Sequence, residues 1–175
     1  MEEKLKSAFM PSLIPGIYLG FALIIFTLLT YVLDVDMESP IKYVSYAIMA
    51  IGLYLSTVSF RDKHLDGYIS YGKAFSAGFY TGFFAAILAG IFTYIYVQYI
   101  DTELIANILI LAEENMLEQN PDMSNEQLDQ ALSMTEMFTS PLMMSILGFV
   151  ANVIVSALIS ALIAIFAKRE NTQIA

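Results

Sequence analysis

Four long uncharged runs divide the chain. Asp, Glu, Lys, Arg and His are absent from residues 7–33, 43–60, 74–100 and 137–167, which are 27, 18, 27 and 31 residues long. About 20 residues of helix cross a hydrocarbon layer about 30 Å thick, because a helix rises about 1.5 Å per residue. The pattern predicts an all-α integral membrane four-helix bundle, a single membrane domain over residues 1–175. Its spans are expected at about 10–33, 43–60, 74–100 and 141–167.

A buried core helix of a soluble protein is the alternative explanation of such runs. Hydrophobic residues make up 58% of the chain and charged residues only 14%. A soluble bundle of 175 residues could not cover that much apolar surface, so the membrane interpretation is favoured.

Basic residues lie almost entirely on one side of the predicted spans. Seven of the eight, all except Lys42, precede the first span, join the second to the third, or follow the fourth. Lys and Arg are enriched in cytoplasmic loops, so we expect both termini in the cytoplasm. Twelve of the 17 acidic residues lie in the other loops, 34–42 and 101–140, which are expected to face outward.

Small residues recur every four positions in the predicted spans. In lipid, helices associate through close backbone approach and polar contacts. The predicted packing residues are Gly16 and Gly20, Gly52 and Ser56, Ala74, Gly78, Gly82, Ala86 and Gly90, and Gly148, Asn152, Ser156, Ser160 and Ala164. One straight crossing uses only two or three members of such a row, because a step of four residues overshoots a full turn by about 40°. Packing within the bundle and self-association both fit these rows.

Asn152 is the one strongly polar side chain deep in a predicted span. An amide in lipid gains about 0.6–2 kcal/mol from an interhelical hydrogen bond. We expect Ser145, Ser156 or a hydroxyl of the second span to be its partner, with a ligand contact as the alternative.

The segment 101–140 holds nine acidic residues and no basic one. It is predicted to form two amphipathic helices. The first runs from about Thr102 to Gln119, with Leu104, Ile108, Leu111 and Asn115 on one face. The second ends near Ser140 and carries Leu128, Leu132 and Thr135, with Met134, Met137 and Phe138 beside them. Asn120-Pro121-Asp122 separates them, and Ser124 followed by Gln127 is typical of a capping box. The pattern predicts an extracytoplasmic helical hairpin between spans three and four. A solvated face and a cationic partner both explain its acidity.

Residues that carry out catalysis or hold cofactors are not gathered in this sequence. There is no Cys, and His64 is the single His, which excludes thiolate chemistry and a compact His-based metal site. A calcium loop starting at Asn120 or Asp122 would lack the Gly at position six and the Glu at position twelve. Proton relays and ion-coupled transporters place charges inside the bundle, and these spans contain none. We therefore predict no catalytic, cofactor or metal site, and no enzymatic activity.

The loop between spans two and three carries the most distinctive motif. It contains the predicted interfacial residues Gly67, Tyr68, Ser70, Tyr71, Gly72 and Lys73 in the run Gly67-Tyr68-Ile69-Ser70-Tyr71-Gly72-Lys73-Ala74-Phe75. Gly67 suits a turn, and the tyrosines suit the headgroup level before span three. With Gly78 and the long acidic insert, this motif resembles a bacterial family of small four-span membrane proteins, the domain-of-unknown-function family numbered 4199. The resemblance covers about residues 7–168, implies an inner-membrane location and supplies no catalytic residue.

These observations predict a small polytopic inner-membrane protein that contacts the lipid bilayer and acts through self-association or membrane-protein partners, not through nucleic acid. The alternative is a passive channel or transporter subunit, favoured by the hydroxyl and amide side chains along span four.

Overall fold

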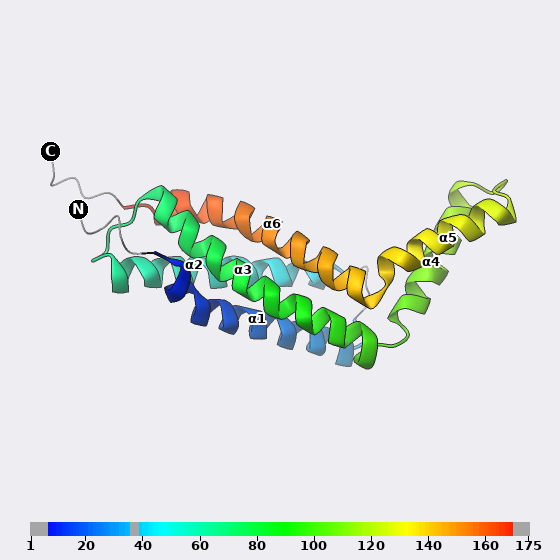
Figure 1. Ribbon diagram of the computed structural model, residues 1–175, viewed down its shortest axis with the longest axis horizontal. Coiled ribbons are helices and arrows are strands. Elements are labelled where there is room, and N and C mark those ends of the chain that lie inside the picture. The colour runs from blue at the N-terminus through cyan, green and yellow to red at the C-terminus, as the bar shows by residue number, and fades with distance from the viewer. Residues whose placement is uncertain (1–6, 36–38, 170–175) are drawn as a thin grey trace. The chain divides into compact units, whose positions relative to one another are not determined.

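The computed structural model describes residues 7–35 and 39–169, and nearly all of them are helical (Figure 1). The elements in chain order are α1 (Phe9–Val32), the 3-10 helix η2 (Pro40–Tyr43), α2 (Val44–His64), α3 (Tyr71–Ile95), the π-helical turn η3 (Tyr96–Ile100), α4 (Leu104–Gln119), α5 (Asn125–Thr139) and α6 (Pro141–Ala167). Four helices, α1, α2, α3 with its π-helical continuation, and α6, are long and apolar enough to cross a membrane. The predicted all-α fold with four span-like helices is confirmed.

The helices α2 and α3 extend further toward the loop between them than the charge pattern predicts. α2 ends at His64 rather than near residue 60, and α3 begins at Tyr71 rather than near residue 74. Arg61 and Lys63 lie in the last turn of α2, where a cation is stabilised by the helix dipole. Their long side chains can also reach water from a helix at the membrane border. The first charge therefore marks the end of the apolar run and not the end of the helix.

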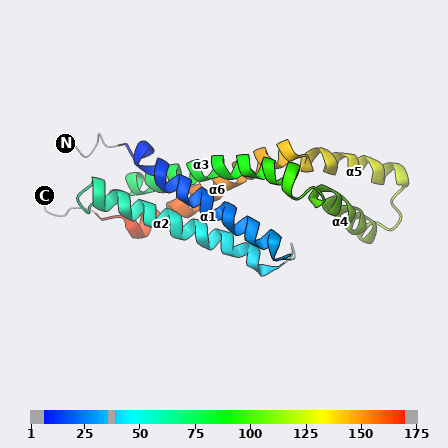
Figure 2. The same cartoon turned by 90° about the horizontal axis from the view of Figure 1, so that it is seen from below.

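Packing divides the chain into two compact units, Met1–Ala89 with Phe149–Ala175, and Gly90–Gly148. In the first unit α1, α2, α3 and α6 lie side by side as a bundle (Figures 1 and 2). The start of α1, the end of α2, the start of α3 and the end of α6 share one end of this bundle (Figure 1). Large apolar side chains cover its outside, among them Ile14, Phe21, Ile25, Leu158, Leu162 and Phe166. An apolar exterior of this kind suits a lipid environment.

The second unit contains a helical hairpin in which α4 contacts α5. The predicted capping box is present: the Gln127 backbone N–H donates to Ser124 Oγ over 3.3 Å, and the Ser124 N–H donates to Gln127 Oε1 over 3.2 Å. The predicted apolar face of α4 is partly wrong, because Leu111 and Asn115 are exposed while Ile105 and Leu109 are half-buried. The half-buried positions of α4 keep Leu104 and Ile108 from the predicted face and add Ile105, Leu109, Ala112 and Met116 beside it.

Between α3 and α4 the backbone widens into a π-helical turn that the sequence did not predict. The Asp101 N–H donates to the Tyr96 carbonyl over 2.9 Å, and the Tyr96 hydroxyl donates to Asp101 Oδ2, also over 2.9 Å. This segment contains neither Gly nor Pro, so no residue type marked the change of helix.

Candidate functional site

The interior of the four-helix bundle is lined with hydroxyl groups and organised around α3. The hydroxyl residues that are at most 5% exposed are Ser12, Ser56, Thr57, Thr81, Ser156 and Ser160. Ser56 Oγ lies 2.6 Å from Thr81 Oγ1, and this hydrogen bond joins α2 to α3. Ser12 Oγ donates to the Ala77 carbonyl over 3.1 Å and joins α1 to α3. Such bonds average about 0.6 kcal/mol between membrane helices, so they orient the helices more than they hold them together.

The predicted rows of small residues on α3 and α6 face each other. A Cβ atom built on Gly78 would lie 2.6 Å from Ser160 Oγ, and one built on Gly82 would overlap the Ser156 side chain. Both pairs belong to one antiparallel register, because four residues forward along α3 match four residues back along α6. The same register pairs Ala74 with Ala164, and both are fully buried. The closest approach of the two helices therefore requires glycine on α3.

The glycines of α1 and α2 also sit at helix contacts. A Cβ on Gly16 would lie 2.6 Å from Phe84 Cβ and 2.8 Å from the Thr81 carbonyl oxygen. A Cβ on Gly20 would lie 2.9 Å from Leu88, and one on Gly52 would lie 2.6 Å from Leu19. These residues pack α1 onto α3 and α2 onto α1.

The remaining members of the two rows behave differently. Ala86 and Gly90 are buried, but a Cβ on Gly148 would meet nothing within 4 Å. Close packing at Gly148, which the sequence predicts, is therefore not found. The physical reason is that residues spaced by four shift around the helix by about 40° at each step. A row that begins at a helix contact therefore faces away from that contact after a few steps.

Asn152 is half-buried in α6. Of its predicted partners, Ser145 donates to the Gly90 carbonyl over 2.8 Å, and Ser156 Oγ lies 3.6 Å from Met49 Sδ. Each hydroxyl retains the capacity to accept a hydrogen bond, so the interhelical role of Asn152 stays a prediction.

Sequence reasoning missed three interior hydroxyls, Ser12, Thr57 and Thr81. Two of them extend patterns that were visible: Ser12 lies four residues before Gly16, and Thr81 lies midway between Ala77 and Ala85 at the same spacing. Counting Ser and Thr with Gly and Ala as small residues would have found both. Thr57 bonds only to its own helix, with its hydroxyl donating to the Leu53 carbonyl over 2.8 Å. No spacing rule separates that arrangement from an exposed threonine.

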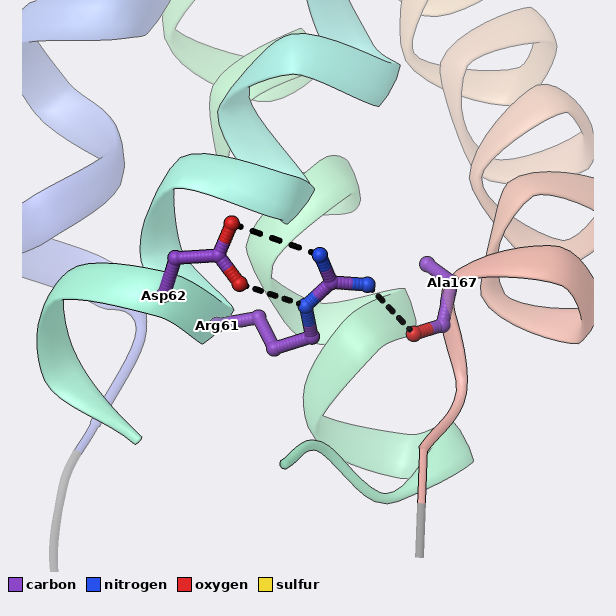
Figure 3. A network of polar contacts seen from close by, with 3 residues as sticks. All are labelled: Arg61, Asp62 and Ala167. Carbon is purple, nitrogen blue, oxygen red and sulfur yellow. Dashed lines mark hydrogen bonds and ion pairs between the residues drawn. The ribbon is translucent and has the colours of Figure 1, made fainter. Parts of the chain in front are cut away.

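A second polar arrangement occupies the end of the bundle that holds Arg61, Lys63, Lys73, Lys168 and Arg169, which we call the basic end. Arg61 is 8% exposed, and its guanidinium lies between α2 and the end of α6 (Figure 3). Nε donates to Asp62 Oδ1 over 2.7 Å and Nη2 donates to Asp62 Oδ2 over 3.3 Å. Nη1 donates to the Ala167 carbonyl over 3.4 Å. Arg61 thus caps the negative end of α6 while its own charge is neutralised.

The chain following α6 is tied to the loop that follows α2. The Ile69 N–H donates to the Arg169 carbonyl, and the Arg169 N–H donates to the Ile69 carbonyl, each over 2.9 Å. Ile69 is fully buried. The loop reaches this position through a turn in which Asp66 and Gly67 have φ values of 52° and 85°, a conformation that glycine adopts without steric cost. Residues far apart in sequence therefore close the basic end together.

The predicted interfacial residues divide between this loop and α3. Tyr71, Gly72 and Lys73 form the first turn of α3, and Ser70 accepts the Ala74 N–H through its carbonyl. Tyr68 and Tyr71 are each 43% exposed, and their position at the headgroup level stays a prediction. Lys73 differs, because its Nζ is buried and has no hydrogen-bond partner in the described part of the chain. An ionisable side chain in such a setting is a candidate contact for an acidic group.

Across residues 7–35 and 39–169, no three His, Cys, Asp or Glu side chains are placed to hold a metal ion. What the geometry provides is a closely packed bundle with one reinforced, positively charged end.

Comparison with known proteins gives a family and no closer relative. No curated protein and no solved structure matches the chain. The family model described as protein of unknown function (DUF4199) matches residues 15–169 of the 175. That range contains the interior hydroxyls from Ser56 onward, the basic end from Arg61 to Arg169, and the whole α4–α5 hairpin. The chain belongs to the DUF4199 family.

Proposed function

We propose that this chain is a non-enzymatic multi-pass protein of the bacterial inner membrane that acts by associating with other membrane proteins. The observation that supports it best is the close packing of the helices at their glycines. At Gly16, Gly78 and Gly82 even a methyl group would collide with the neighbouring helix. These helix contacts leave no space for a substrate at the three glycines, so we place recognition at the surfaces and ends of the bundle.

Both termini are proposed to lie in the cytoplasm. The basic end gathers five of the chain's eight Lys and Arg residues at the start of α3 and the ends of α2 and α6, and positive loops remain on the cytoplasmic side. The absence of native Cys makes this simple to test. Ser133→Cys in α5 should react with a membrane-impermeant maleimide in intact spheroplasts, and Ser7→Cys should react only after permeabilisation. Labelling in the reverse order would contradict the orientation.

A partner of different sequence is favoured over self-association through the small-residue rows. The members that pack most closely, Gly78 and Gly82, are occupied by α6 of the same chain. The outward faces carry large side chains such as Ile25, Leu158 and Leu162 instead. A nucleic-acid partner is disfavoured by the net charge of −9.

A passive channel is the second candidate, and the line of interior hydroxyls is its support. The same close packing argues against it, because a conducting path needs continuous space. Reconstituted vesicles should therefore show no flux of ions or small solutes. Flux that Asn152→Leu abolishes would favour the channel instead.

The partner proposal is tested by tagged purification from native membranes in a mild, lipid-preserving detergent, followed by mass spectrometry and intact-mass stoichiometry. We expect a second membrane protein in a fixed ratio. Recovery of the chain alone, or only as a homo-oligomer, would contradict the proposal.

A further inference from the structure

The α4–α5 hairpin has large apolar side chains that its own two helices leave exposed. No residue of α4 or α5 is buried. Ile110 is 54% exposed, and Leu117, two helical turns further along, is 39% exposed. Two helices alone bury only the strip between them, and a helix pair becomes a stable core when a further element covers the open side. The two helices of the hairpin therefore leave one apolar side open.

That open side is a shallow groove between the helices, with a volume of about 300 Å³. Leu109, Ile110 and Leu132 supply its apolar part, and Glu113, Asp129 and Glu136 supply its carboxylates. Asp129 and Glu136 are seven residues apart on α5, which places them on one face about 10 Å apart. Glu113 adds a carboxylate from α4. The groove thus combines an apolar centre with acidic groups contributed by both helices.

The negative charge of the groove and its surrounding segment favours a cationic occupant. The segment 101–140 has nine acidic residues and no basic one, and the three groove carboxylates form no ion pair within residues 7–35 and 39–169. A second copy of this segment would bring nine more negative charges, and an anionic lipid surface would also be repelled. A cationic occupant is attracted instead. It can pair with the groove carboxylates without first breaking an ion pair within the described residues.

We propose that the groove between α4 and α5 docks a basic amphipathic helix of a partner protein. The apolar side chains of that helix would pack on Ile110 and its neighbours, as in other helix-in-groove complexes. Its Lys and Arg side chains would lay their aliphatic stems along the groove and place their charges at Glu113, Asp129 and Glu136. This inference rests on the proposed function, since it names the chemistry of the partner.

The test uses the full-length protein in phosphatidylcholine nanodiscs, with a fluorescent amphipathic helix of leucine and lysine as probe. A leucine–glutamate helix of the same pattern and empty nanodiscs serve as controls. Anisotropy should report saturable binding of the lysine helix alone. The triple substitution Glu113→Gln, Asp129→Asn and Glu136→Gln should weaken binding about tenfold or more. The matched triple Glu114→Gln, Glu118→Gln and Glu126→Gln removes equal charge outside the groove and should change binding about twofold.

An apolar comparison completes the test. Ile110→Ser should weaken binding, whereas Met137→Ser, at a side chain equally exposed but outside the groove, should not. Equal effects of the two triple variants would overturn the groove and indicate attraction to net charge alone. Equal effects of the two serine variants would also overturn it, because the apolar contact would then not be specific to the groove.

Purification from native membranes separates this inference from the proposed function. Loss of the partner from the groove triple variant, with retention by the matched triple, supports the groove. A partner that both variants retain overturns the groove and leaves the proposed function standing. A wild-type chain that brings down no partner overturns the proposed function itself.

Discussion

The close contact between α3 and α6 predicts that adding a methyl group at Gly82 destabilises the bundle only while the Ser156 side chain is present. A methyl group added by Gly82→Ala would overlap Ser156, which is fully buried and attached close to the backbone of α6. The helices must therefore separate to admit it. Gly148→Ala is the matched control in a helix interior, because a Cβ there meets nothing within 4 Å.

The magnitude follows from two opposing effects. Overpacking in a close-packed core costs about 1–3 kcal/mol, and replacing glycine by alanine in a helix gains about 0.5–1 kcal/mol. Gly82→Ala should therefore lower the free energy of unfolding by up to about 2.5 kcal/mol, while Gly148→Ala raises it by about 0.5–1 kcal/mol. Ser156→Gly removes the obstructing side chain. In that background Gly82→Ala should become stabilising, with a coupling of about 1–3 kcal/mol between the two positions.

The assay is equilibrium unfolding in mixed micelles of increasing dodecyl sulfate fraction, followed by far-ultraviolet circular dichroism for the four single and double variants. A Gly82→Ala protein that gains stability as Gly148→Ala does would refute the predicted close contact. So would a Gly82→Ala penalty that persists unchanged beside Ser156→Gly.

Three further predictions concern the ends of the helices. Arg61→Gln should lower the free energy of unfolding by about 1–3 kcal/mol, because the Ala167 carbonyl and the Asp62 carboxylate lose a charged donor; the same dichroism assay checks it, and a result equal to that of Lys63→Gln would contradict it. Arg169→Pro removes the N–H that bonds to Ile69 and should speed deuterium exchange of the Ile69 amide, whereas Arg169→Ala keeps the N–H and should leave that exchange slow. Ser124→Ala should cost the α5 helix about 1 kcal/mol and Ser124→Gly only a few tenths, measured by thermal unfolding, and equal losses would exclude the side-chain cap.

The bundle could be predicted from sequence because lipid imposes a simple rule. A span must satisfy its backbone internally and avoid charge over about 20 residues, so uncharged runs report helices directly. Spacing of small residues likewise identified Gly16, Gly20, Gly52, Gly78 and Gly82, whose contacts leave no space for a side chain. These are local properties that one helix carries by itself.

What could not be predicted depends on contacts between distant segments. The bridge between Ile69 and Arg169, and the bond from Arg61 to the Ala167 carbonyl, join residues about a hundred positions apart. Gly148 has the same residue type and spacing as Gly82 but faces open space, because the position of a row relative to its neighbour is set by the crossing of two helices. The exposed position of Leu111 has the same origin, because the contact with α5 determines which positions of α4 are covered.

Buried polar atoms without a hydrogen-bond partner help to distinguish a channel from a protein that binds partners. Among the six buried hydroxyls of the bundle, Ser160 Oγ is the one without a hydrogen-bond partner in the described residues, and it lies where a Cβ on Gly78 would be. A channel would need many such groups in a continuous line with space between them. The Lys73 ammonium at the basic end is the other buried polar atom without a hydrogen-bond partner in the described part of the chain. Glu113, Asp129 and Glu136 of the hairpin are exposed, so they are available to charged groups of other proteins, whereas a polar interior tied up in packing does not suit transport.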